Sequence, residues 1–168
     1  MRVISFPDMP GIDPWHTLAH QLKSESAILA TRITPESLRA TYEQGCAVLL
    51  MNGSEEPIGF LAAWPVNCSH TEIGSAWVQP EYRDRKLSNL LYNRLRELPA
   101  VQERTIFGIT KNVRSVKAGY LAQLKLHDNW QDPVPWELTC GPCDAFKTDA
   151  EKRLCPWRNW TCWLRVRN

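Results

Sequence analysis

The residues between Glu72 and Leu98 combine an acidic strand residue, a cationic turn and an amphipathic helix. Arg83, Arg85 and Lys86 come directly before a run of leucines at helical spacing, so they precede a helix N-terminus. The first backbone N–H groups of a helix have no partner within the helix, and together with nearby cations they attract phosphate. This order of residues predicts a site for a phosphorylated ligand.

A second group of chemically active residues is the set of cysteines near the end of the chain. Cys140, Cys143, Cys155 and Cys162 are four of the six cysteines, and four thiolates can hold a tetrahedral zinc ion. The Cys-x2-Cys spacing of the first pair is common in zinc sites, but the second pair is spaced more widely. Cys162 also falls on an alternating strand, where cysteine often packs as a small apolar side chain. Three interpretations stay open: structural cysteines, a zinc site and a redox pair at Cys140 and Cys143. No metal is assigned.

The composition is that of a folded globular protein. The chain has 168 residues, of which 43% are hydrophobic and 23% charged, and this predicts a single domain. A net charge of +2 does not favour nucleic-acid binding. The chain lacks an apolar run of about 18 residues, so no membrane partner is expected. Prolines interrupt the first 15 residues, unlike a secretory signal, and we therefore expect a cytoplasmic protein.

The positions of apolar residues and turn residues predict the elements that must hold these side chains. Thr34 is expected to cap a helix that begins at Pro35 and ends at Gly45. The other helices are expected at 15–22, 87–98 and 112–126, and strands at 1–6, 46–51, 58–66, 70–78, 105–110 and 160–166. Hairpins followed by a strand–helix–strand crossover predict an α/β fold of the α+β kind, with a central mixed sheet flanked by helices.

The sequence WVQPEYR at 77–83, followed by the leucine-spaced helix, resembles the acyl-CoA-binding segment of the GNAT superfamily of N-acetyltransferases. The family's turn has Arg or Gln, two variable residues, Gly, one variable residue, then Gly or Ala. Arg83 takes the first place and Ser88 the last, while Lys86 stands where the family has glycine. A lysine there must adopt a compatible backbone conformation, which is strained if it is left-handed. It could equally offer its ammonium group to the phosphates.

The resemblance covers residues 46–126 and implies a GNAT-like acyl-CoA N-acyltransferase fold over 1–168. In that fold two neighbouring parallel strands splay apart and acyl-CoA lies between them. Residues 1–45 would supply the N-terminal helices, and 127–168 would form a Cys- and Trp-rich C-terminal segment. The co-substrate implied is acetyl-CoA.

The resemblance also implies which residues bind the co-substrate. Backbone groups of the strand before the turn pair with the pantetheine amides of CoA, much as an added strand would. Asn112 follows the second splayed strand, where it would either touch CoA or cap the next helix. The cofactor-binding residues implied are Ala76, Trp77, Val78, Arg83, Asp84, Arg85, Lys86, Leu87, Ser88 and Asn112.

Two residues are implied as catalytic. Glu72 stands on the strand where family members carry a general base, with His70 on the same face as the alternative. Tyr120 is the tyrosine of the expected helix at 112–126 and would be the general acid, or else a packed core residue. It lies one position past the family's usual spacing from Asn112. A backbone N–H near Val78 would polarise the thioester carbonyl.

These inferences lead to one main functional hypothesis and a set of alternatives. The main one is an acetyl-CoA-dependent N-acetyltransferase that moves an acetyl group directly to a primary amine of a small molecule or protein. One alternative is a non-catalytic acyl-CoA-binding protein of the same fold, favoured by Lys86 and by the offset of Tyr120. The other is a zinc-stabilised interaction module whose basic turn contacts an acidic partner. The acceptor stays open, and either a monomer or a homodimer is compatible with the sequence.

Overall fold

The computed structural model describes residues 1–25, 33–110 and 112–126, together with the backbone of residues 163–167. The expected zinc or structural cysteines Cys140, Cys143, Cys155 and Cys162 lie outside these ranges, as does the beginning of the strand expected at 160–166. None of the helices in the described part is both long enough and apolar enough to cross a bilayer.

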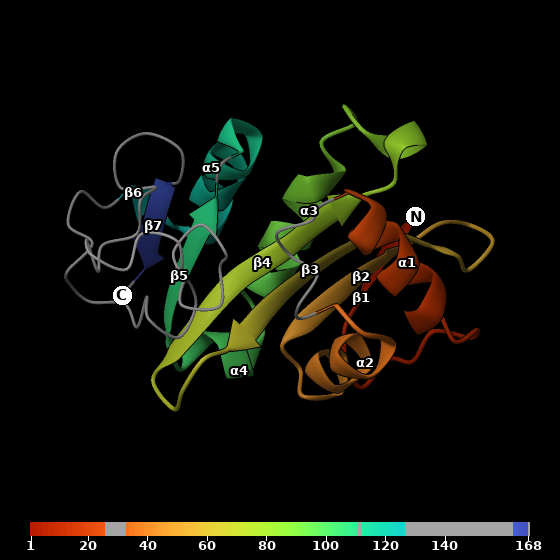
Figure 1. Ribbon diagram of the computed structural model, residues 1–168, viewed down its shortest axis with the longest axis horizontal. Coiled ribbons are helices and arrows are strands. Elements are labelled where there is room, and N and C mark those ends of the chain that lie inside the picture. The colour runs from red at the N-terminus through yellow and green to blue at the C-terminus, as the bar shows by residue number, and fades with distance from the viewer. Residues whose placement is uncertain (26–32, 111, 127–162, 168) are drawn as a thin grey trace, which may run out of the picture.

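The strands of the described residues form one mixed sheet with the order β1-β2-β3-β4-β5-β7-β6. Neighbouring strands are antiparallel except for β4 and β5, which run parallel in the middle of the sheet. This confirms the predicted mixed sheet (Figure 1). The strands are β1 (Arg2–Ile4), β2 (Ala47–Met51), β3 (Pro57–Pro65), β4 (His70–Val78), β5 (Thr105–Thr110), β6 (Lys125–Leu126) and β7 (Trp163–Arg167).

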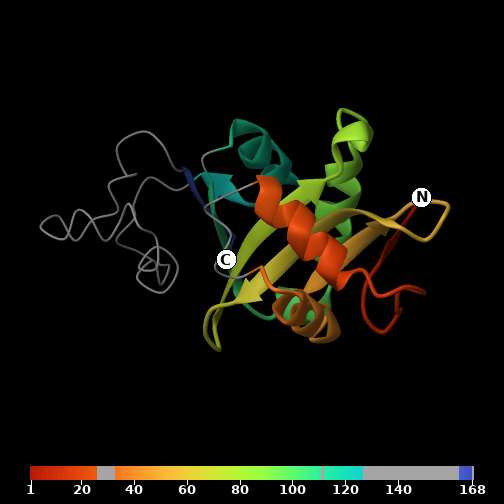
Figure 2. The ribbon, with the colours of Figure 1, turned by 45° about the vertical axis from the view of Figure 1, so that its right-hand side comes forward.

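Helices cover both faces of this sheet. One core cluster joins α1 and α2 to the sheet, and a second joins α3, α4 and the 3-10 turn η3 to its other face. Figure 2 shows α1 crossing the front of the strands. The helices are α1 (Trp15–Glu25), α2 (Pro35–Glu43), α3 (Leu87–Leu95), α4 (Pro99–Gln102) and α5 (Val113–Gly119), with 3-10 turns η2 (Pro80–Tyr82) and η3 (Tyr120–Ala122).

Short-range sequence signals explain where α1 and α2 form. The Thr34 hydroxyl accepts the Ser37 N–H at 3.1 Å, and the Ser37 hydroxyl accepts the Thr34 N–H at 3.0 Å, so α2 begins with a capping box. The apolar spacing of α1 places Trp15, Leu18 and Leu22 in the core, as predicted.

Two of the predicted helices were too long. Helix α3 ends at Leu95, and its buried residues are Leu91, Tyr92 and Leu95, whereas Leu90 is 47% exposed. The leucine spacing predicts one apolar stripe along this helix that includes Leu90, and this prediction is wrong at Leu90. Pro99, which lacks a backbone N–H, starts the separate helix α4 instead of continuing α3.

The helix expected at 112–126 ends at Gly119. The 3-10 turn η3 follows, and Gln123 adopts the left-handed conformation with φ 62°. That turn buries Leu124 completely and directs the next two residues into β6. Burying Leu124 and pairing β6 with β7 require the chain to reverse its direction after α5, and this is why the helix ends at Gly119.

Candidate functional site

The central feature of the site is a parallel strand pair that separates partway along its length. Strands β4 and β5 pair at three positions, of which Glu72–Phe107 is the last. Beyond it, the remaining residues of β4 and β5 do not pair with each other, and Figure 1 shows the two strands diverging toward its upper edge. We call the segments Ile73–Val78 and Gly108–Thr110 the fork. The predicted splay of two parallel strands is confirmed.

Hydrogen bonding decides which backbone groups of β4 face the fork. The Gln79 N–H donates to the Ile58 carbonyl at 2.8 Å. In an antiparallel ladder this bond places the N–H and C=O of Trp77 toward β3 and those of Val78 toward the opposite side. The Ala76 C=O, which shares a peptide with the Trp77 N–H, also points away from β3. Among the three predicted pantetheine contacts, Ala76 and Val78 thus present backbone to the fork. Trp77 does not, and its side chain is a core residue with 5% exposure.

A β-bulge interrupts β4 within the fork. The register changes between the pairs Ala62–Gly74 and Phe60–Trp77, so that two residues of β4 stand opposite one residue of β3. Ser75, the first of the two, is left-handed with φ 56° and buried, while the next residue, Ala76, is exposed. The bulge therefore redirects the strand next to Ala76.

The cationic turn follows β4 directly and leads into α3. Lys86 occupies the N-cap position of α3 with φ 58° and ψ 21°, and Asp84 is also left-handed. Lysine thus takes up the conformation that glycine adopts without strain. Because no side chain caps α3, the N–H groups of Leu87 and Ser88 at its first turn donate no hydrogen bond to a capping side chain.

Arg83 holds the turn in place through two hydrogen bonds. Its Nε donates to the Val78 carbonyl at 2.9 Å, and its NH2 nitrogen lies 2.6 Å from the Glu25 carboxylate at the end of α1. The Val78 carbonyl already accepts a hydrogen bond from Arg83. The Val78 N–H is therefore the backbone group of this residue that can serve a ligand in the fork. The guanidinium charge of Arg83 is shared with Glu25.

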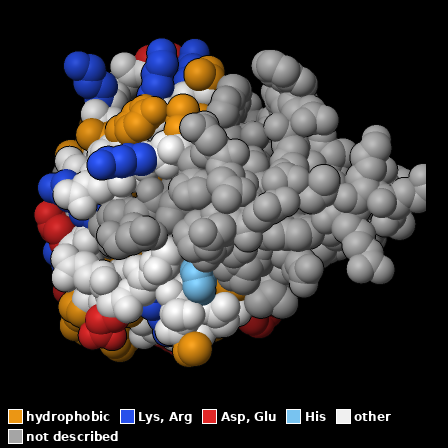
Figure 3. All heavy atoms as spheres, turned by 90° about the vertical axis from the view of Figure 1, so that its left-hand side faces the viewer, with side chains coloured by type: hydrophobic (Ala, Val, Ile, Leu, Met, Phe, Trp, Pro, Cys, Tyr) orange, Lys and Arg blue, Asp and Glu red, His pale blue; other side chains and the backbone are white. Residues whose placement is uncertain are grey.

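Further cations border the turn. The Arg85 guanidinium lies 5.5 Å from the centre of the Tyr82 ring, a cation–π distance. On α5, Arg114 lies 3.7 Å from Asp84 across the end of the fork, and both side chains are exposed. On the face shown in Figure 3, Lys and Arg side chains gather toward the upper edge, where α5 lies in Figure 1. Cations therefore border the open end of the fork, and two of them, Arg83 and Arg114, are paired with the carboxylates of Glu25 and Asp84.

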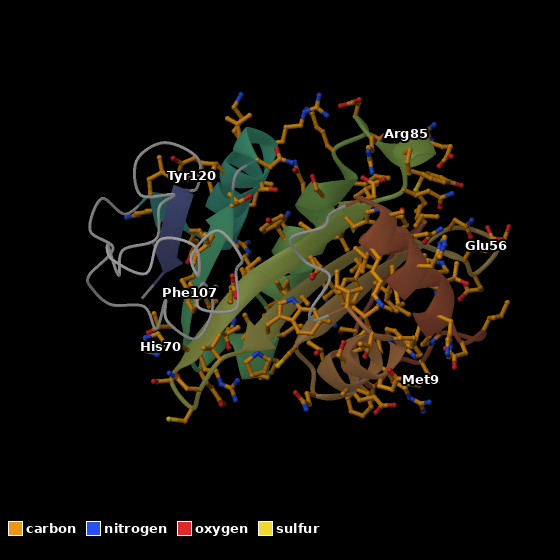
Figure 4. All side chains as sticks on the ribbon, in the orientation of Figure 1. Met9, Glu56, His70, Arg85, Phe107 and Tyr120 are labelled. Atoms are coloured by element: carbon orange, nitrogen blue, oxygen red, sulfur yellow. The ribbon has the colours of Figure 1, made fainter. Side chains whose placement is uncertain are left out.

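Glu72 lies at the closed end of the fork, opposite Phe107 on β5 and Trp64 on β3. It is partly buried, and residues that are opposite in a ladder share a face of the sheet. His70 sits beyond the fork, where its Nδ1 lies 3.0 Å from the Ser69 hydroxyl. Figure 4 shows His70 and Phe107 together at this closed end. The position therefore favours Glu72 over His70 as the group next to a ligand in the fork.

Two predicted site residues follow β5. Asn112 caps α5, because its side-chain oxygen accepts the Arg114 N–H at 2.9 Å; the capping alternative is therefore confirmed. Tyr120 comes after the end of α5, on η3, and is 52% exposed. It is not a packed core residue, and its role as the general acid stays a prediction.

The described residues contain no cluster of His, Cys, Asp or Glu that could hold a metal. Cys46 is buried and Cys68 exposed, both as free thiols. Burial raises the pKa of the Cys46 thiol. Neither cysteine lies on the fork, so neither supplies chemistry to it.

The sequence analysis missed four residues that shape this site: Ser75, Trp64, Glu25 and Arg114. A glycine inside a strand, as at Gly74, is a known sign of a bulge and was the available signal for Ser75. Trp64, Glu25 and Arg114 make their contacts with residues distant in the sequence, so no local sequence signal could have identified them.

Structural comparison finds the same fold in several solved proteins. An acetyltransferase from Streptococcus agalactiae superposes with a TM-score of 0.61 at 14% identity, covering 99% of this chain and 96% of that one. N-acetylglutamate synthase from Neisseria gonorrhoeae, solved with coenzyme A and N-acetyl-glutamate, gives 0.59 at 15% identity, covering 100% of this chain and 36% of that one. Rv2747 from Mycobacterium tuberculosis, in complex with CoA, gives 0.53 at 11% identity, covering 88% and 93%. These likenesses show the fold.

Sequence comparison shows the family. The comparison with curated proteins finds no match. Residues 12–116, well over half of the chain, match the profile described as the acetyltransferase (GNAT) family, and this range contains the fork, the cationic turn and α3. The chain belongs to the GNAT family of acetyltransferases.

Proposed function

We propose that this protein transfers an acetyl group from acetyl-CoA to a primary amine. The observation that carries the proposal is the fork, in which β4 and β5 part after Glu72 and Phe107 beside a cationic turn at a helix N-terminus. The backbone groups of Ala76 and Val78 on the open side of β4 suit an extended chain that bears amides and a thioester carbonyl. The turn suits its phosphates. An acyl-CoA, with its amide-bearing pantetheine and its phosphates, matches both halves of this site.

Acetyl-CoA would supply an activated thioester, whose C–S bond breaks as the acceptor nitrogen forms the new C–N bond. Glu72, at the closed end of the fork, would take the proton that the amine loses. Backbone N–H groups on the open side of β4 would stabilise the charge on the carbonyl oxygen. Tyr120 would give a proton to the departing thiolate if its side chain reaches the fork.

The first test is calorimetric titration of the protein with acetyl-CoA and with 3′-dephospho-CoA. Micromolar binding of acetyl-CoA, weakened by loss of the 3′-phosphate, is expected from the cationic turn. Absence of binding at millimolar acetyl-CoA would refute the proposal. A screen of amine acceptors that follows release of the CoA thiol then tests turnover and identifies the acceptor class.

Variants at the two proposed catalytic residues test the mechanism. Glu72→Gln should slow transfer most at low pH, where the amine needs a base, while acetyl-CoA binding stays the same. Tyr120→Phe should lower the turnover rate with little change in acetyl-CoA binding. Unchanged turnover in either variant would remove that residue from the mechanism.

A second candidate function is acyl-CoA binding without catalysis. Tyr120 lies past the end of α5, and Arg83 is bonded to Glu25 and Val78, which favours a site with fewer groups devoted to chemistry. Tight acetyl-CoA binding with no thiol release across the amine screen would support this alternative. Transfer to any amine would exclude it.

A further inference from the structure

Trp64 and Ser75 form a buried contact at the bulge of β4 that the proposed mechanism does not use. The Trp64 Nε1 donates a hydrogen bond to the Ser75 hydroxyl at 3.1 Å, and the two residues are 7% and 3% exposed. A buried hydrogen bond of this kind has no competing water and holds its two partners in one geometry. The bond therefore ties β3 to the one left-handed residue of the bulge.

The Trp64 ring lies against the backbone of β4 at Gly74. A Cβ atom added at Gly74 would meet the Trp64 Cδ1 at 3.4 Å and Nε1 at 3.5 Å. The indole thus lies over the backbone of β4, one residue before Ser75. Trp64 also stands opposite Glu72 in the ladder, so one ring borders both the proposed base and the bulge.

Ser75 needs such support because of its backbone. A left-handed conformation is strained for a residue other than glycine, because its Cβ crowds the following carbonyl oxygen. The conformation of Ser75 sets the direction of the following peptide, whose N–H belongs to the exposed Ala76 on the open side of β4. A relaxed Ser75 would turn that N–H away from the fork.

We propose that Trp64 is a positioning residue for acetyl transfer: through its hydrogen bond to Ser75 it holds the bulge so that the Ala76 N–H points at the thioester carbonyl. This inference rests on the proposed function, because it assumes an acyl-CoA in the fork. Trp64 touches no reacting atom in this account. It acts through the backbone of β4.

The test uses isotope-edited infrared spectroscopy of acetyl-CoA labelled with 13C at the carbonyl. A hydrogen bond from the Ala76 N–H lowers the carbonyl stretching frequency of the bound ligand. In Trp64→Phe, which keeps an aromatic ring but loses the N–H donor, that downshift should shrink, and turnover should fall about tenfold with unchanged acetyl-CoA Kd. The double variant Trp64→Phe with Ser75→Gly should recover the downshift, because glycine adopts the left-handed conformation without support.

Trp15→Phe is the matched control. Trp15 is also buried and belongs to the same core cluster, but it lies on α1. It should lower stability without changing the carbonyl frequency. Thermal unfolding of all variants separates a general loss of folding from loss of the carbonyl signal.

The experiment distinguishes failure of the positioning role from failure of the proposed function. A carbonyl frequency in Trp64→Phe equal to that of the wild type would overturn the positioning role, and so would a double variant no better than Trp64→Phe. Failure of the wild type to bind acetyl-CoA would overturn the proposed function and this inference together.

Discussion

Replacing Lys86 by glycine should make the protein more stable. Lys86 has φ 58° and ψ 21°, a left-handed backbone that costs a residue with a Cβ roughly 1–2 kcal/mol. Glycine removes that cost, but its freer unfolded chain offsets about 0.4–1 kcal/mol of the gain. The net gain of about 1 kcal/mol corresponds to a rise in Tm of roughly 2–4 °C for a chain of this length.

Lys86→Ala is the matched control for this prediction. Removing the ammonium group also relieves repulsion among the cations of the turn, and this effect is common to both variants. Alanine keeps the left-handed strain. Only the glycine variant should therefore show the rise in Tm that comes from relieving this strain. Thermal unfolding monitored by circular dichroism measures both. Equal Tm values for the two variants would show that residue 86 is not left-handed in solution.

Acetyl-CoA titration of the same pair assigns the role of the side chain. If the ammonium group contacts phosphate, both variants should bind more weakly than the wild type. If only the backbone matters, the glycine variant should bind at least as tightly as the wild type.

Three further predictions concern the frame around the site. Thr34→Ala removes one half of the capping box and should cost about 1 kcal/mol of unfolding free energy, measured by urea denaturation; an unchanged midpoint would contradict the capping role. Leu91→Ala should cost roughly 2–5 kcal/mol because Leu91 is 1% exposed, whereas Leu90→Ala on the exposed side of α3 should be nearly neutral. Cys68 should be alkylated rapidly in the folded protein and Cys46 only on unfolding, since Cys46 is buried with a raised thiol pKa; mass spectrometry with a thiol reagent checks this, and equal rates would refute it.

Features that depend on neighbouring residues were predictable from the sequence. The bounds of β4 at His70 and Val78 follow from its alternation and from Pro80, which cannot donate to a ladder. The start of α2 follows from Thr34 and Pro35, whose roles are confined to one turn of chain. The cationic turn before α3 was predictable for the same reason.

Features that depend on tertiary pairing were not predictable. The bulge exists because β3 and β4 adopt a particular register, and its hydrogen bond joins Trp64 to Ser75 across the hairpin. The partner of Arg83 is Glu25, 58 positions away in the sequence. A period of 3.6 residues predicted a long helix after Asn112, but it carries no information on the chain reversal that brings β6 to β7.

The position of β7 in the sheet has a consequence for synthesis of the protein. Strand β7, at residues 163–167, lies between β5 and β6, although both of those strands precede it in the chain. While the chain is being made, the edge of β5 stays unpaired and β6 has no β7 to join until residues 163–167 emerge from the ribosome. Strands β1 to β4 pair in chain order and can assemble earlier. We therefore expect one arm of the fork to form well before the other, with β5 the part of the nascent protein most exposed to wrong pairing.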